Sequence, residues 1–171
     1  PVDMDAHQAW ATGLFRHVHR TLLGPLFVAI NVAVFVVMVA TGVDANAPDT
    51  GDLVRWGANH WTLSLADEPW RLLTSGFLHI GLVHLALNCY ALIQLRFVEQ
   101  VLGRSGWLVT YLGAIVAGSL LSVARHAGAP SAGASGGIFG LMGAVLAVSV
   151  APRAQTGIPE ELRTALRNGM V

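Results

Sequence analysis

Four apolar runs divide the chain into segments that would suit the interior of a lipid bilayer. The first run, residues 25–43, has no charged side chain and nearly the length of about 20 residues that a membrane-spanning helix needs. The other runs cover residues 76–98, 107–124 and 131–150. The pattern predicts an all-α polytopic membrane helix bundle. A cleaved signal peptide is an alternative for the first run, although its apolar core would be shorter.

Composition also favours the bilayer as the solvent of this chain. Of its 171 residues, 54% are hydrophobic and only 12% are charged, and the mean hydropathy is +0.58. Soluble domains carry about 25% charged residues. The formal net charge is zero, so the charge gives no reason to expect a nucleic acid as partner.

The runs predict a single membrane domain over residues 25–152, preceded by a cytoplasmic segment at 1–24 and followed by a cytoplasmic loop at 153–171. Seven of the ten arginines lie in or beside segments on the side that holds both chain ends, and three lie on the opposite side. The positive-inside rule then places the N terminus in the cytoplasm. We expect a multi-pass protein of a bacterial plasma membrane.

The segment between the first two runs, residues 44–75, is long and mixed in composition. A connection of this length with no obvious secondary structure is uncommon unless it is functional. It contains Trp56, Trp61 and Trp70, and tryptophan is enriched where the membrane meets water. We therefore expect this segment to lie at the membrane interface.

Polar side chains interrupt the second apolar run, where they are costly and often functional. His84 and Asn88 are four residues apart and share one helix face, whereas His79 lies about 140° away around a continuous helix and should point elsewhere. Two donors aimed at one spot in a low-dielectric interior suit a developing oxyanion. The alternative is a buried polar pair that joins helices through hydrogen bonds.

Ser135 lies at the start of the fourth run, in the string Gly133-Ala134-Ser135-Gly136. The flanking glycines leave its hydroxyl uncovered and allow close backbone approach, and free N–H groups at a helix start can assist an anion. Gly136 and Gly140 have the spacing that permits tight helix packing. The alternative is a packing face in which Ser135 serves only as an N-cap.

Five short strings occur in the order and spacing of the rhomboid proteases. They are Trp70-Arg71, His79, His84-Leu-Ala-Leu-Asn88, Glu99-Gln-Val-Leu-Gly103 and Gly133-Ala-Ser-Gly136. Each string is weak by itself, and together they are specific. Over residues 25–152 the chain resembles a rhomboid-type intramembrane serine protease.

The resemblance implies an endopeptidase that cuts transmembrane segments of membrane proteins in the lipid bilayer, without a cofactor or metal. Ser135 would be the nucleophile, and His84 and Asn88 would form the oxyanion hole together with the N–H of Ser135. Gly133 and Gly136 would complete the motif around the serine. The segment 44–75 would lie partly in the outer leaflet, and Glu99 would make a structural contact on the cytoplasmic side.

Rhomboid proteases use a Ser-His dyad whose histidine lies on the sixth helix, and a serine nucleophile needs such a base. The last of the seven histidines of this chain is His126, nine residues before Ser135, in a turn, which disfavours it as the base. We therefore interpret the chain as four of the six core helices, C-terminally incomplete, and expect these 171 residues alone to be inactive.

The sequence leaves three alternatives to a protease open. A rhomboid-like pseudoprotease would keep the fold and act as a binding or chaperone factor for membrane proteins, but the presence of Ser135 with its oxyanion partners argues against it. A zinc site at His60, His79 and His84 has no HExxH string to support it. The third alternative is a channel or transporter that uses the buried His and Asn side chains, but transporters often show repeated, interrupted helices and no repeat is visible.

Overall fold

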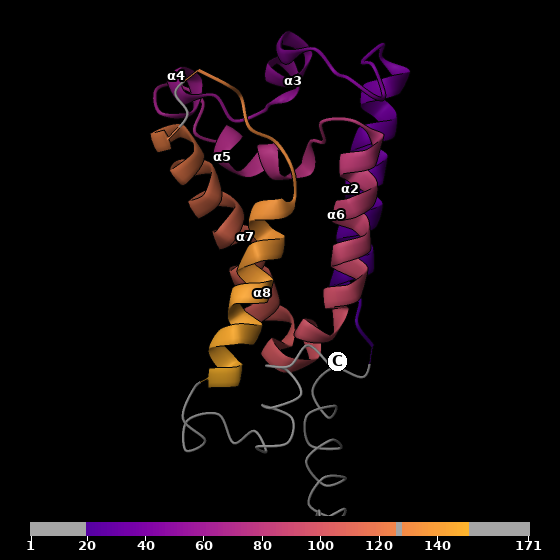
Figure 1. The fold of residues 1–171 in the computed structure, drawn as a ribbon, viewed down its shortest axis with the longest axis vertical. Helices are drawn as coiled ribbons and strands as arrows, with labels where there is room; N and C mark the ends of the chain where they lie inside the picture. The colour runs from indigo at the N-terminus through magenta and orange to yellow at the C-terminus, as the bar shows by residue number, and fades with distance from the viewer. Residues whose placement is uncertain (1–19, 126–127, 151–171) are drawn as a thin grey trace, which may run out of the picture.

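The computed structural model describes residues 20–125 and 128–150 (Figure 1). In that part of the chain helices are the only extended regular structure, which confirms the all-α prediction. The long helices are α2 (Leu23–Ala40), α6 (Leu82–Gln94), α7 (Val98–Arg125) and α8 (Ser135–Val150). The short ones are α3 (Thr50–Trp56), α4 (Trp61–Ser64), α5 (Arg71–Thr74) and the 3-10 turns η1 (Ser75–Phe77) and η2 (Leu95–Phe97). The predicted segment 153–171, most of 1–24, and His126 lie outside the described residues.

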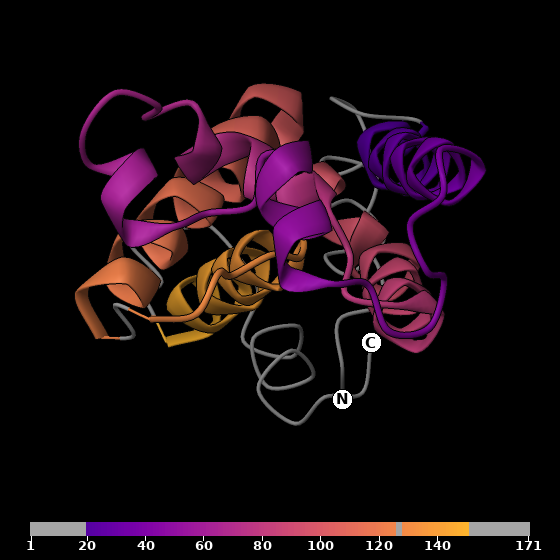
Figure 2. The ribbon, with the colours of Figure 1, turned by 90° about the horizontal axis from the view of Figure 1, so that it is seen from above.

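The long helices run along the long axis of the molecule, and α3, α4 and α5 gather at one end (Figure 1). Viewed from that end, α2 and α6 lie side by side, and α7 and α8 lie together on the opposite side (Figure 2). Within the described residues, α2 and the helical run Leu82–Arg125 are long and apolar enough to cross a bilayer, with mean hydropathies of 2.5 and 1.8. The apolar helix α8 is shorter.

Two long helices begin later than the apolar runs suggested. The run at 76–98 becomes helical as α6 only from Leu82, because Gly81 has φ +91° and its Cα lies against the Asn46 carbonyl, where a Cβ would be 2.5 Å from the oxygen. The run at 131–150 becomes helical only at Ser135. Hydropathy alone does not distinguish an extended apolar segment from a helical one, so both starts were misplaced.

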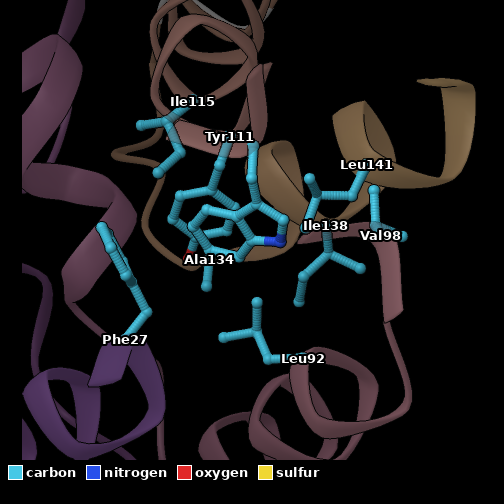
Figure 3. Close-up of a cluster of buried hydrophobic side chains, with 9 residues drawn as sticks. Phe27, Leu92, Val98, Tyr111, Ile115, Ala134, Ile138 and Leu141 are labelled. Atoms are coloured by element: carbon cyan, nitrogen blue, oxygen red, sulfur yellow. The ribbon is translucent and has the colours of Figure 1, made fainter. Parts of the chain in front are cut away.

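Helices α2, α6, α7 and α8 meet in one buried apolar cluster (Figure 3). Trp107 and Tyr111 of α7 stack with ring centroids 4.8 Å apart, and Phe27 of α2 packs edge-on to Tyr111 at 4.9 Å. Lipid tails are as apolar as these side chains, so the cluster stabilises the bundle through close packing rather than through transfer from water.

Small residues bring α7 and α8 into close contact. A Cβ at Gly140 would lie 2.2 Å from the Cβ of Ala114, and one at Gly136 would lie 3.3 Å from the Ala114 carbonyl oxygen. A Cβ at Gly137 would lie 2.5 Å from the ring of Tyr111. The predicted tight packing at Gly136 and Gly140 is therefore confirmed, whereas Gly143 has no such neighbour within 4 Å.

The segment that joins α2 to α6 is organised by a buried arginine. Arg71 is only 6% exposed, and its guanidinium donates to the carbonyl oxygens of Val54 and Ala58. It also pairs with the carboxylate of Glu68 and lies 4.6 Å from the ring centroid of Trp70. At the start of the segment, Asp44 accepts hydrogen bonds from the N–H groups of Ala47 and Asn46, which lower the pKa of its carboxyl. The location of this segment at the membrane interface stays a prediction.

Glu99, in the first turn of α7, binds the start of α2. Its carboxylate is fully buried and accepts hydrogen bonds of 2.8 Å from the N–H groups of both Leu22 and Leu23, at the start of α2. A negative charge at a helix N terminus is stabilising because the first N–H groups have no partner within the helix. Glu99 thus makes the structural contact that the resemblance implied, and its other oxygen lies 3.5 Å from Arg104.

Replacing Glu99 with alanine is expected to destabilise the bundle by about 2 kcal/mol, since two main-chain donors at the start of α2 would lose their buried acceptor. Thermal unfolding in detergent measures the loss. The matched control is Arg104→Gln, which should cost little because that side chain is 56% exposed and exposed ion pairs contribute little. Equal losses in the two variants would contradict the capping role of Glu99.

Candidate active site

Ser135 is the first residue of α8 and lies inside the bundle. The chain descends from the end that holds α4 before α8 begins, so the helix starts below the layer of short helices (Figure 1). Ala134 is fully buried, and its carbonyl accepts the N–H of Ile138 at 3.0 Å. Ser135 itself is half-buried, and its N–H belongs to the first turn, where donors have no carbonyl partner within the helix.

His84 of α6 contacts the segment that leads into Ser135. A Cβ at Gly133 would lie 2.5 Å from Cε1 and 3.0 Å from Nε2 of the His84 ring, so only glycine allows the ring to lie there. Gly133 also has φ +131°, which glycine adopts without strain. The N–H of Ile80 donates to Nδ1 of His84 at 3.4 Å. In a neutral ring the proton is then on Nε2, which makes the nitrogen nearer Gly133 a donor.

Asn88 lies one helical turn beyond His84, as predicted, and is 5% exposed. Its side-chain amide donates to the main-chain carbonyl of His84 at 2.7 Å. One of its two N–H groups is thereby used within α6, and one remains for another acceptor. The structure thus brings His84 to the Ser135 segment through a direct contact, and it holds Asn88 against the turn that carries His84.

His79 does not point away from His84, and that prediction was wrong. The two rings lie 5.4 Å apart, centroid to centroid, and His79 is fully buried. The angle of 140° assumed a continuous helix, but α6 begins at Leu82, so His79 belongs to the turn before it. Among the described residues, no group of three His, Cys, Asp or Glu side chains is placed to hold a metal ion.

A cavity of about 230 Å³ opens beside Ser135, between α7 and α8. Its lining is rich in hydroxyl groups and includes Ser75, Ser119, Ser122 and Ser131 besides Ser135. Phe139, one helical turn after Ser135, is 69% exposed and also lines it. Ser135 therefore faces a space that is large enough for a small group and lined with hydrogen-bonding side chains.

The extended segment before Ser135 is fixed at two points. Asn59 and Ser131 form an isolated antiparallel bridge, with N–H···O distances of 3.0 and 2.9 Å. Two residues later, the N–H of Gly133 donates to the carbonyl of Ser75 at 2.9 Å. Sequence reasoning did not identify Asn59, Ser75, or Ser119, although a serine inside the third apolar run was a signal of the kind that marks function.

Comparison with known proteins identifies the family of this chain. The family model described as Rhomboid domain matches residues 66–165. Rhomboid protease GluP of Bacillus subtilis (strain 168) is 41% identical over 129 residues, which cover 75% of this chain and 25% of that protein. Rhomboid-like protease 2 of Toxoplasma gondii is 32% identical over 148 residues, which cover 81% of this chain and 51% of that protein.

A third relative is named as an inactive member of the family. Inactive RHOMBOID-like protein 8 of Arabidopsis thaliana is 37% identical over 101 residues, or 58% of this chain and 29% of that protein. The chain spans between a quarter and about half of the length of these three relatives. No solved structure is significantly similar to it. Since the rhomboid model matches more than half of its residues, the chain belongs to the rhomboid family of integral membrane proteins.

Proposed function

We propose that the full-length protein is an intramembrane serine endopeptidase that cleaves transmembrane segments of other membrane proteins. The observation that carries the proposal is the contact between the His84 ring and Gly133, two residues before Ser135. It holds a side-chain donor against the segment that leads directly into a half-buried serine, inside a bundle of apolar helices. Donors fixed around one reacting oxygen are the usual source of rate acceleration in acyl transfer.

In the proposed reaction, Oγ of Ser135 attacks the carbonyl carbon of the scissile peptide bond and loses its proton to a base. By resemblance to rhomboid proteases that base is a histidine on a later helix. The carbonyl oxygen becomes an oxyanion, which accepts hydrogen bonds from the N–H of Ser135, from Nε2–H of His84 and from the amide of Asn88. The base returns its proton to the leaving amine, and water then hydrolyses the acyl-enzyme.

The substrates of this class are membrane proteins with a single span, and the enzyme and substrate share the bilayer. The distribution of arginines supports an N terminus in the cytoplasm, and we propose a bacterial plasma membrane as the location. The second candidate is a rhomboid-like binding or chaperone factor. A relative that is 37% identical and named as inactive supports this candidate. The contact between His84 and Gly133, two residues before Ser135, favours the protease.

Labelling and cleavage by the full-length protein in proteoliposomes test the proposal. A fluorescent fluorophosphonate should label Ser135 covalently, and a single-span reporter protein should be cut within or next to its span. Labelling together with cleavage supports the protease. A folded protein that binds the reporter but neither cleaves it nor reacts with the phosphonate would be a binding factor instead.

His84→Ala in the full-length protein should lower kcat by about 100- to 1000-fold, the usual cost of losing one oxyanion donor. KM should change little, because the donor acts on charge that develops only in the transition state. Steady-state cleavage of the reporter in proteoliposomes separates the two constants. His60→Ala is the control, since that ring bonds to Thr62 in the α3–α4 region. A higher KM with unchanged kcat would assign His84 to substrate binding.

A further inference from the structure

Asn59 connects three parts of the molecule through four hydrogen bonds. Its N–H and C=O pair with the C=O and N–H of Ser131. Its side-chain nitrogen, Nδ2, donates to the main-chain carbonyl of Ser119 in α7 at 2.9 Å and to Oγ of Ser131 at 3.0 Å. The residue is 1% exposed. One side chain thus holds the loop after α3, the helix α7 and the segment that leads to Ser135.

The loop that presents Asn59 is itself held by hydrogen bonds of the neighbouring residue, Ala58. Its neighbour Ala58 is fully buried, donates its N–H to Leu53 at 2.9 Å and accepts a hydrogen bond from the guanidinium of Arg71. Because Arg71 is buried as well, the position of Asn59 does not depend on a solvent-exposed loop. Because Asn59 is held in this way, the segment at Ser131 that it binds is also held in position.

Ser75 also links the segment before Ser135 to α7. The Ser75 carbonyl accepts the N–H of Gly133, and the Ser75 hydroxyl lies 3.2 Å from that of Ser119. The Ser75–Ser119 contact and the Asn59–Ser119 bond meet at one turn of α7. Residues 131–133 are therefore held along their length against loop and helix together, and only Ala134 separates this segment from Ser135.

We propose that Asn59 is a positioning residue for the nucleophile. It sets the path of residues 131–133, and through them the direction of the Ser135 hydroxyl and the place of Gly133 against His84. Asn59 does not touch the reacting atoms. The proposal rests on the proposed protease function, because it assigns a residue to the same site.

A displacement of the nucleophile by about 1 Å can cost about 100-fold in rate. Asn59→Ala in the full-length protein should therefore lower kcat by about 10- to 100-fold. KM for the single-span reporter should stay within about twofold, because a residue that acts only on the transition state leaves ground-state binding unchanged. The rate constant for covalent labelling of Ser135 by the fluorophosphonate should fall by the same factor as kcat.

Two further variants separate positioning from general stability. Thr74→Val removes a hydroxyl that donates to Gly57 at 2.9 Å in the same loop, with little change of shape, and should lower the thermal midpoint while leaving the labelling rate of the folded protein unchanged. Both Asn59→Ala and Ser131→Ala keep the main-chain bridge, but Ser131→Ala removes only one of the two acceptors of Asn59 Nδ2 and leaves the bond to Ser119, so its labelling rate should fall less than that of Asn59→Ala.

The outcomes are distinct. Slow labelling in Asn59→Ala, a smaller decrease in Ser131→Ala and wild-type labelling in Thr74→Val support the proposal. Wild-type labelling rates in folded Asn59→Ala, or an equal decrease in Thr74→Val, would overturn it and leave the protease function standing. Should Asn59→Ala not fold, an unchanged rate in Ser131→Ala overturns it. Absence of any labelling in the wild-type protein would overturn both the protease function and this role of Asn59.

Discussion

Replacing Ser135 with alanine is expected to abolish proteolysis and phosphonate labelling by the full-length protein while leaving its fold intact. Without Oγ there is no atom to form the acyl-enzyme, and loss of the nucleophile in a serine protease costs about 10⁶-fold in kcat. The fold should survive because Ser135 is the first residue of α8 and alanine is the residue that favours a helix most. Cleavage of the single-span reporter and the thermal midpoint in detergent measure the two effects.

The matched control for this variant is Ser122→Ala. Ser122 lines the same cavity as Ser135 but belongs to α7 and not to the string Gly133–Gly136. It should keep both cleavage and labelling. If Ser135→Ala still cut the reporter at the wild-type rate, another residue would be the nucleophile and the proposed mechanism would be wrong.

Gly133→Ala should produce the second-largest loss. The new methyl group would lie 2.5 Å from Cε1 of His84, closer than two carbon atoms can approach, and the backbone at φ +131° would be strained by about 1 to 3 kcal/mol. Either His84 or the segment before Ser135 must move. A shift of about 1 Å in either costs about 100-fold in kcat, so we expect a loss of at least that size together with a lower thermal midpoint.

Gly143→Ala is the control for a glycine replacement in the same region. Gly143 lies within α8, and a Cβ there would meet nothing within 4 Å. Alanine at this helical position should keep full activity and stabilise the helix by up to about 1 kcal/mol. Gly133→Ala with a kcat within tenfold of wild type would show that the contact with His84 is not needed for catalysis.

Local patterns in the sequence were sufficient to predict much of this molecule. Apolar runs predicted the long helices, and the spacing of His84 and Asn88 placed both on one helix. The polar residues inside those runs pointed to the site because burial in an apolar interior is costly unless a side chain has a role. The glycines at 136 and 140 predicted tight helix packing, since only small residues allow backbones so close, and the structure shows that the partner helix is α7.

Features that depend on contacts between distant segments could not be predicted in this way. The orientation of His79 was wrong because the start of α6 is set by the approach of Asn46 to Gly81, and hydropathy does not record such a contact. Asn59 was missed because its partners are 60 and 72 residues away along the chain. A single polar residue in a mixed loop carries no sign of what it binds.

The cap that Glu99 provides for α2 has a consequence for biosynthesis. The carboxylate and the N–H groups it accepts are 76 and 77 residues apart. At synthesis rates of about 5 to 20 residues per second, that separation corresponds to roughly 4 to 15 s. During that interval the first N–H groups of α2 lack the carboxylate that accepts them in the folded bundle. The N-terminal end of α2 is therefore capped only after Glu99 has been synthesised, and this contact joins the start of α2 to the start of α7.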